Sequence, residues 1–167
     1  MKTPVTSKTI IYIDMDDTLC DYQTSHDAAK VKQPEINYPQ SQEGFFLNLP
    51  PYEGAVDTVR WLIEQPELQV LLLTAPSVLN PHCYTEKRVW VERHFGLEHC
   101  HRLIISAYKG LSRGDYLIDD KTSGFGQEDF QGTLIHYGSS AFPNWPAVKM
   151  YFDKLITATL HPVQYES

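Results

Sequence analysis

Carboxylates are gathered in two short motifs, and each motif directly follows an apolar run. The first motif is DMDD at 14–17 after the residues TIIYI, and the second is DD at 119–120 after the residues YLI. Carboxylates a few Å apart stay ionised only with a cation between them. Hard oxygen ligands with room for water and a phosphate oxygen suit Mg²⁺. The two motifs therefore predict a Mg²⁺ site, whereas Asp17 and Asp21 are expected to serve turns or helix caps.

Two polar residues outside these motifs have the chemistry that phosphate handling requires. Thr74 directly follows the apolar run LQVLLL, and Lys109 precedes the sequence DYLIDD. Phosphoryl transfer places charge on the equatorial oxygens of the transferred group, so cations and hydrogen-bond donors must surround it. Thr74 and the backbone N–H groups after it are candidate donors, and Lys109 is the candidate cation. Lys87 could also reach the site from the start of its helix, but it is expected to be solvated, as lysines usually are.

A parallel sheet would bring these residues together. Continuous apolar runs, typical of buried parallel strands, alternate with segments of helical periodicity. The expected strands are 9–13, 68–73, 103–105, 116–118 and 133–137, and the expected helices are 54–65, 85–95 and 145–160. This order predicts an α/β, Rossmann-like fold, with a parallel sheet and helices on both of its faces. Ligands of such sheets bind at the carboxyl ends of the strands, where both carboxylate motifs and Thr74 lie.

The segment 22–47 differs in character from the rest of the chain. It is polar, contains Pro34 and Pro39, and has no sustained periodicity apart from a short helix expected near 25–31. We interpret it as a small cap insertion after the first strand, and residues 1–21 together with 48–167 as the core. Its position directly after the first carboxylate motif predicts a mobile cap that excludes water when substrate binds.

Composition limits the classes of function. The 167 residues carry 14 Lys and Arg against 21 Asp and Glu, a formal net charge of −7. This sign argues against binding to nucleic acid polymers, which requires a basic surface. The sequence shows no signal peptide and no run of about 18 apolar residues, and its three scattered cysteines fit a reducing compartment. We therefore expect a cytoplasmic protein without membrane contact, and the sequence leaves a homodimer open.

The motifs occur in the order found in the haloacid dehalogenase superfamily of phosphatases. D-x-D-x-T follows the first strand, Thr ends the second, and a lysine precedes a strand that ends in DD. More specifically, most of the chain resembles the 5′(3′)-deoxyribonucleotidases through DMDDTLCDY, GFFLNLPPYEGAV, LLLTAPS, EKRVWVERHFG and YKGLSRGDYLIDDK. The resemblance implies a Mg²⁺-dependent phosphatase that hydrolyses deoxynucleoside or nucleoside monophosphates to nucleoside and phosphate.

The resemblance also implies roles for the residues at matching positions. Asp14 would be the nucleophile that becomes an aspartyl phosphate. Asp16 would protonate the leaving oxygen of the nucleoside and then act as a base on water. Mg²⁺ would be bound by Asp14, by the backbone carbonyl of Asp16 and by Asp119, with Asp120 behind these ligands.

Phosphate would be held by Thr74, Ala75 and Lys109, but the motifs depart from the family here. The family reads TSP where this chain has Thr74-Ala75-Pro76, so one hydroxyl is missing although the backbone N–H remains. The family also reads DMDG where this chain has Asp17, which adds a charge at the mouth of the site.

The cap insertion is shorter than in the vertebrate enzymes, which removes part of the aromatic clamp around the base. Tyr22, Phe45 and Phe46 remain as the residues expected to contact a substrate base. Two other functions stay open at this point. A phosphatase for sugar phosphates or other small esters would need no base contact, and a receiver-like switch domain would share the acidic residues, the threonine and the lysine. The order of the motifs argues against the receiver, which has its acidic pair after the first strand.

Overall fold

The computed structural model describes residues 7–160 of the chain. Residues 1–6, on which the expected lack of a signal peptide depends, and residues 161–167 lie outside the described part. The strands are β1 (Thr9–Ile13), β2 (Leu68–Thr74), β3 (Leu103–Ile105), β4 (Tyr116–Asp119) and β5 (Thr133–His136). The α-helices are α1 (Tyr22–Lys32), α2 (Ala55–Glu64), α3 (Cys83–Phe95) and α4 (Trp145–Leu160). Short 3-10 helices are η1 (Pro39–Ser41), η2 (Leu97–Arg102), η3 (Lys109–Leu111) and η4 (Gln127–Asp129).

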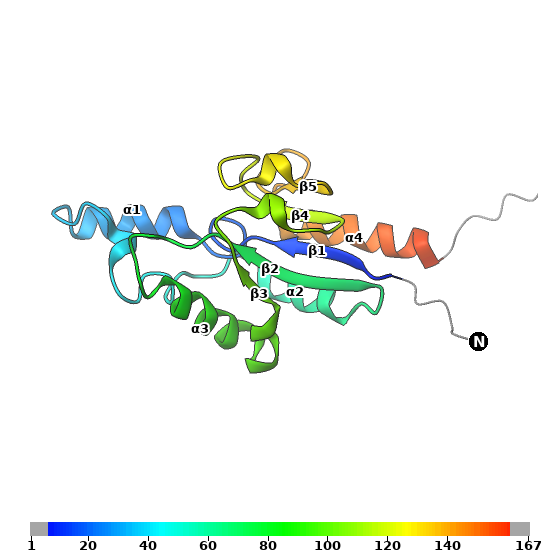
Figure 1. Ribbon diagram of the computed structural model, residues 1–167, viewed down its shortest axis with the longest axis horizontal. Helices are drawn as coiled ribbons and strands as arrows, with labels where there is room; N and C mark the ends of the chain where they lie inside the picture. The colour runs from blue at the N-terminus through cyan, green and yellow to red at the C-terminus, as the bar shows by residue number, and fades with distance from the viewer. Residues whose placement is uncertain (1–6, 161–167) are drawn as a thin grey trace, which may run out of the picture.

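The strands form one parallel sheet in the order β3-β2-β1-β4-β5 (Figure 1). The expected α/β, Rossmann-like fold is confirmed, and each strand agrees with its expected range to within one residue. The chain moves from β1 outward to β2 and β3 and then returns to β4 on the other side of β1. The strand order therefore reverses beside β1. Because parallel strands end at the same edge, the residues that follow β1 and those that end β4 meet at this point.

One face of the sheet carries the large hydrophobic core. Ile11 and Ile13 of β1 pack there with buried side chains of α2, α3 and α4. Trp90 of α3 and Trp145 of α4 are fully buried in this core. The indole N–H of Trp145 donates to the backbone carbonyl of Thr18 at 3.0 Å. This bond ties α4 to the loop after β1, so the core directly supports the first carboxylate motif.

The opposite face of the sheet differs from the expectation of helices on both faces. Its buried cluster consists of Tyr12, Leu73 and Leu117 with Phe130, the residue that follows η4, and no described α-helix contributes to it. The reason lies in the connection from β3 to β4. Residues 106–115 must cross over β2 and β1 to reach β4, and a helical crossover needs about a dozen residues or more.

Helix α1 extends away from the carboxyl end of the sheet, apart from the other three α-helices (Figure 1). None of its 11 residues is buried. The chain returns to the main core after η1, where Phe46 and Leu49 are buried. The helix expected near 25–31 is thus present and longer than expected. The segment 22–47 is exposed at its start and anchored at its end.

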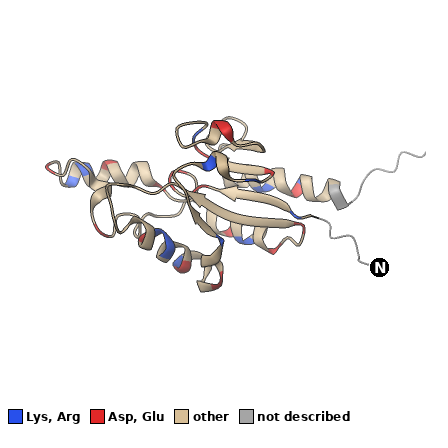
Figure 2. Cartoon of the chain, in the orientation of Figure 1, with Lys and Arg blue, Asp and Glu red and all other residues tan. Residues whose placement is uncertain are grey.

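Basic and acidic residues are interspersed along the helices, as Figure 2 shows for α3. The same helix carries the ion pair between Arg88 and Glu92. Within residues 7–160 no helix combines the length and the apolar character that crossing a membrane requires.

Asp17 is the one non-glycine residue of the described chain with a positive φ, at 58°. Its side-chain Oδ1 accepts the backbone N–H of Gln23 at 2.8 Å, at the start of α1. The family that this chain resembles has glycine at this position, and glycine adopts a left-handed backbone without strain. Aspartate is tolerated here because its short polar side chain bonds locally.

Substitution of Asp17 is expected to separate backbone strain from this hydrogen bond. Asp17→Ala loses the bond and keeps a Cβ in the left-handed region, so it should lower the free energy of unfolding by about 1–2 kcal/mol. Asp17→Gly loses the bond only and should be about 1 kcal/mol more stable than the alanine variant. Urea titration of both variants measures the difference. At Asp27, inside α1, alanine should instead be the more stable substitution.

Candidate active site

The carboxylates meet where β1 and β4 end side by side. Asp14 and Asp119 expose 5% and 0% of their surface. The backbone N–H of Asp14 donates to the carbonyl of Ile118 at 2.9 Å, which extends the pairing of β1 and β4 into the site. Carboxylate oxygens of Asp14, Asp119 and Asp120 all lie within 4.8 Å of one another. Convergent, largely buried carboxylate oxygens of this kind form a binding site suited to a hard divalent cation.

Lys109 lies between the two buried carboxylates. Its Nζ is 2.7 Å from Oδ1 of Asp14 and 2.5 Å from Oδ2 of Asp119, and the side chain is 2% exposed. Burial acts to lower the pKa of Lys109, but the two carboxylates outweigh it and hold the pKa above its ordinary value. An ammonium group has three donors. Two are used here, so the third is available to a phosphate bound beside Asp14.

Asp119 is oriented by two further donors around its carboxylate, besides Lys109. Nε2 of Gln127 lies 3.2 Å from each carboxylate oxygen, and the backbone N–H of Lys121 donates to Oδ1 at 2.9 Å. Burial and the charge of Asp14 raise the pKa of Asp119, and Lys109 offsets part of this effect. The fixed orientation leaves Asp119 facing Asp14, as a shared cation would require.

Lys87 corrects an expectation, because it is buried rather than solvated. It lies in the first turns of α3, and its side chain is 1% exposed. Nζ donates to Oδ2 of Asp16 at 2.8 Å, to Oγ1 of Thr74 at 2.6 Å and to the carbonyl of Ala75 at 2.7 Å. The expectation of a solvated side chain followed the average behaviour of lysines, which are mostly exposed. Tertiary structure overrides that average by surrounding the ammonium group with three acceptors.

Asp16 therefore contacts Lys87 and does not belong to the group formed by Asp14, Asp119 and Asp120. Burial raises the pKa of Asp16, and the charge of Lys87 offsets this only in part. About a quarter of the side chain stays exposed (23%), on the side of the cavity. A carboxyl group with a raised pKa that also faces a cavity has the properties of a general acid.

Asp120 is the third member of the carboxylate group and is partly exposed. Burial raises its pKa to about 6, with the charge of Lys121 opposing this and the charge of Asp14 adding to it. The unfolded chain releases this proton near pH 4, whereas the folded protein keeps it until about pH 6. Folding is therefore penalised as the pH rises through this interval, and the penalty persists at higher pH.

Asp120→Asn is expected to remove the penalty. In the absence of divalent ions, the variant should be about 2 kcal/mol more stable than the wild type at pH 7.5 and about equally stable at pH 4. Free energies of unfolding from urea titrations in EDTA at the two pH values measure this. The exposed Asp153→Asn should show no such pH dependence, and a gain at Asp120 that is equal at both pH values would refute the explanation.

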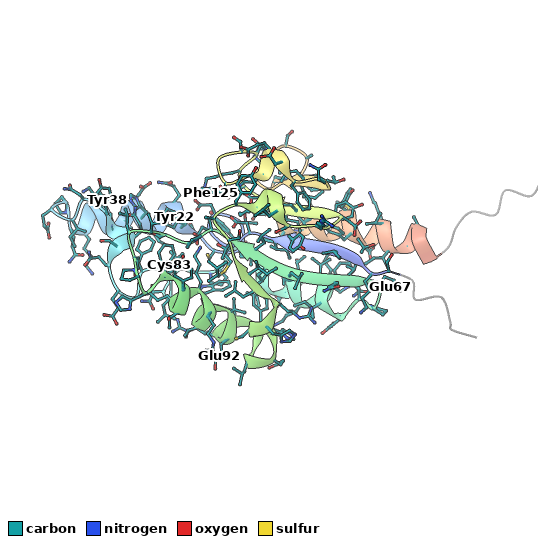
Figure 3. The ribbon with its side chains drawn as sticks, in the orientation of Figure 1. Tyr22, Tyr38, Glu67, Cys83, Glu92 and Phe125 are labelled. Atoms are coloured by element: carbon teal, nitrogen blue, oxygen red, sulfur yellow. The ribbon has the colours of Figure 1, made fainter. Side chains whose placement is uncertain are left out.

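A cavity of about 210 Å³ opens above these groups. It is lined by Asp14, Asp16, Tyr22, Gln40, Phe46, Ala75, Pro76, Ser77, Lys109, Asp119, Lys121, Phe125 and Gln127. Figure 3 shows Tyr22, from the start of α1, and Phe125, from the loop after β4, near each other where α1 meets the sheet. The cavity thus has carboxylates and a lysine at its base and aromatic side chains on its walls.

The aromatic residues singled out in the sequence have different positions. Tyr22 and Phe46 line the cavity and stack with ring centroids 6.1 Å apart. Phe45 does not line it. Its ring packs edge-on against Tyr22 and Phe46 and borders a separate cavity beside α1. Thr74 and Asp120 also lie behind the cavity wall, whereas Ala75 is part of it.

Several cavity residues were missed by sequence reasoning. Phe125 and Gln127 come shortly after the DDK sequence. This closeness along the chain could have indicated that they lie near the site. Ser77 lies two residues after the alanine that replaces the family's serine, and it is one of the residues that line the cavity. Gln40 carried no signal in the sequence. Its place in the wall depends on Asn80, which donates to its backbone carbonyl at 3.0 Å.

The fold is that of the haloacid dehalogenase-like proteins. The structure is similar to that of a haloacid dehalogenase-like family hydrolase from Xanthomonas campestris, with a TM-score of 0.52 over 95% of this chain and 97% of that one, at 11% identity. It is also similar to a HAD family hydrolase from Deinococcus radiodurans R1 solved with bound phosphate and sodium, with a TM-score of 0.50 over 93% and 96% of the chains, at 11% identity. At this identity the two likenesses establish the fold alone.

Sequence comparison is more specific. The family "5′ nucleotidase, deoxy (Pyrimidine), cytosolic type C protein" matches residues 32–143. A Vibrio phage KVP40 protein named "Putative 5′(3′)-deoxyribonucleotidase" is 39% identical over 149 residues, which are 87% of this chain and 85% of that protein. The human cytosolic-type 5′(3′)-deoxyribonucleotidase is 44% identical over 86 residues, which are 52% of this chain and 43% of that enzyme.

The chain belongs to this 5′ nucleotidase family. The family consists of phosphoric monoester hydrolases, so the expected enzyme class is confirmed. The receiver-like alternative is thereby excluded.

Proposed function

We propose that this protein is a Mg²⁺-dependent phosphatase that hydrolyses deoxynucleoside monophosphates through an aspartyl phosphate on Asp14. The observation that supports this most strongly is the buried ammonium group of Lys109 between Asp14 and Asp119. It holds Oδ1 of Asp14, while Oδ2 has no hydrogen-bond partner among the described residues and would attack phosphorus. The names of the family and of its relatives support the substrate class.

The reaction would proceed in two steps. In the first, Oδ2 of Asp14 bonds to phosphorus, the bond from phosphorus to the ester oxygen breaks, and Asp16 gives its proton to that oxygen as the nucleoside leaves. In the second, water attacks phosphorus and loses a proton to Asp16, and the bond to Asp14 breaks as phosphate is released. Asp14 and Asp16 thereby return to their starting states.

Mg²⁺ would be held by Asp14, by Asp119 and by the backbone carbonyl of Asp16, with Asp120 behind them. The donor set fits, because carboxylate oxygens of Asp14, Asp119 and Asp120 lie within 4.8 Å of one another and are ligands that suit a hard divalent cation. In addition, no residue in 7–160 donates a hydrogen bond to the Asp16 carbonyl. When bound, the ion would neutralise charge on the phosphoryl oxygens during transfer.

The phosphate would be held by the third N–H of Lys109 and by the backbone N–H of Ala75, with the Thr74 hydroxyl behind them. Tyr22 and Phe46 would form a wall for a base, and stacking of a base on an aromatic ring contributes about 1–3 kcal/mol. Phe45 would support this wall through its edge contacts rather than by direct stacking.

Residues 22–47 would act as the cap over this cavity, and the exposed helix α1 supports this. Slower hydrogen exchange in 22–47 on addition of a nucleoside with Mg²⁺ and fluoride would support closure, and unchanged exchange would count against it. The cytosolic-type name of the human relative supports a cytoplasmic location.

Phosphate release from a panel of esters tests the proposed function. The panel contains deoxynucleoside and ribonucleoside monophosphates, a sugar phosphate and an aryl phosphate, each with Mg²⁺ and with EDTA. The expected result is Mg²⁺-dependent release with the highest kcat/KM for deoxynucleotides. Release from the sugar phosphate at equal or higher kcat/KM would replace the nucleotidase by a general small-ester phosphatase. Release that persists in EDTA would contradict the metal dependence.

A further inference from the structure

Lys87 is buried beside the site, and the reaction steps above leave it without a role. Its Nζ has acceptors at 2.8 Å (Asp16 Oδ2), 2.6 Å (Thr74 Oγ1) and 2.7 Å (Ala75 carbonyl). These three bonds use all three donors of an ammonium group. Lys87 therefore has no proton left for a phosphate, in contrast to Lys109, which has one.

The three acceptors come from two different parts of the sheet edge. Asp16 lies in the loop after β1, and Thr74 and Ala75 lie at the end of β2. The ring of Phe46 lies 5.1 Å from Nζ, which closes the remaining side with a cation–π contact. The ammonium group is consequently enclosed, and its position relative to Asp16 is fixed by groups that do not belong to the substrate.

This enclosure determines how the Asp16 carboxyl group is turned. Oδ2 is held by Lys87, whereas within residues 7–160 Oδ1 has only the thiol of Cys20 at 4.0 Å as a neighbouring donor. Asp16 also lines the cavity with the exposed part of its side chain. Without the bond to Lys87, the carboxyl group would be free to rotate toward the carboxylates that would hold the cation.

We infer that Lys87 is a positioning residue, which holds one oxygen of Asp16 so that the other faces the leaving oxygen of the substrate. The inference rests on the proposed function, because it assigns proton transfer to Asp16. This role of Lys87 differs in its consequences from a purely structural role and from phosphate binding. Only the steps in which Asp16 transfers a proton should depend on Lys87.

Leaving-group dependence of the Lys87→Met variant tests this. Thymidine 5′-monophosphate has a poor alkoxide leaving group that needs a proton, whereas 4-nitrophenyl phosphate loses a stable phenolate without one. The ratio kcat/KM covers the steps up to release of the alcohol and so excludes the later attack of water. We expect the variant to lose about 10²-fold or more in kcat/KM with the nucleotide and less than about 5-fold with the aryl ester. The same loss with both esters, or no loss with either, would overturn the inference.

Removal of Lys87 alone leaves the partly buried carboxylate of Asp16 without its ion-pair partner, which is destabilising. The double variant Asp16→Asn/Lys87→Met removes both charges and avoids this problem. If Lys87 acts through Asp16, the double variant and Asp16→Asn should have equal kcat/KM with the nucleotide. A further loss of 10-fold or more in the double variant would show that Lys87 acts by another route. A wild-type protein that releases no phosphate from either ester would overturn the proposed function and the inference together.

Discussion

Asp14→Asn is expected to reduce the rate of phosphate release by about four orders of magnitude or more. The amide keeps the shape of the side chain and can still accept a hydrogen bond from Lys109. It has no anionic oxygen to attack phosphorus, so the first bond of the reaction cannot form. The rate of phosphate release from a deoxynucleotide under saturating Mg²⁺ measures the effect.

Stability serves as the control for this variant. The substitution removes one negative charge from a buried group of carboxylates, and that charge raises the pKa of Asp119 in the wild type. We therefore expect the melting temperature in EDTA to be equal to or above that of the wild type. An inactive variant with an unchanged melting temperature would assign the loss to chemistry. Retention of more than a tenth of the wild-type rate would mean that Asp14 is not the nucleophile.

Lys109→Met is expected to lower kcat by about 10³-fold, the upper range for removing one preorganised charged donor. The substitution removes the ammonium group that lies 2.7 Å from Asp14 and 2.5 Å from Asp119. It also removes the N–H available to the phosphate. Because Lys109 is 2% exposed, no water can take its place without rearrangement.

Lys109→Arg should not restore the activity, since a planar guanidinium group is larger and directs its donors differently. The exposed Lys154→Met is the matched control and should keep the wild-type kcat. Steady-state kinetics with a deoxynucleotide distinguish the variants. A Lys109→Met variant with kcat within 10-fold of the wild type would exclude a direct role of Lys109 in the transfer.

The sequence allowed the strand ends to be predicted because their signals are local. Asp14 and Asp119 each follow a continuous apolar run, and the rule for parallel sheets brings such positions together. The structure places both residues at the junction of β1 and β4 and adds Asp120 to the same group. Thr74 was also found in this way, since it ends β2.

The burial of Lys87 was not predicted, although the residue was seen to be within reach of the site, because this burial depends on residues from two distant parts of the chain. Asp16 is 71 positions away from it, and nothing in the local sequence around α3 marks the lysine as different from Arg88. The helical pattern of α3 is also weak, since charged residues occupy both its buried and its exposed faces. Glu86, which is buried and accepts the backbone N–H groups of Gly44 and Phe46, is a second example.

The prediction for the second face of the sheet was wrong for a different reason. The alternation of strands and helices predicted helices on both faces, although the 106–115 connection was visibly short. Counting its residues would have shown that the connection is too short for an α-helical crossover, and it holds only the short 3-10 helix η3. Phe130 and Tyr12 cover this face instead, with their rings in an edge-on contact at 6.1 Å.

Covalent trapping tests the role of Asp14 most directly. In Asp16→Asn, an aryl phosphate can still transfer its phosphoryl group, because its leaving group needs no proton, but the attack of water lacks its base. The variant should therefore accumulate a phosphoenzyme with 4-nitrophenyl phosphate and Mg²⁺. Acid quenching and peptide mass analysis should find one phosphoryl group on Asp14 and none in Asp14→Asn/Asp16→Asn. A phosphoryl group on another residue, or turnover by the wild type without any phosphoenzyme in the Asp16 variant, would contradict the proposed mechanism.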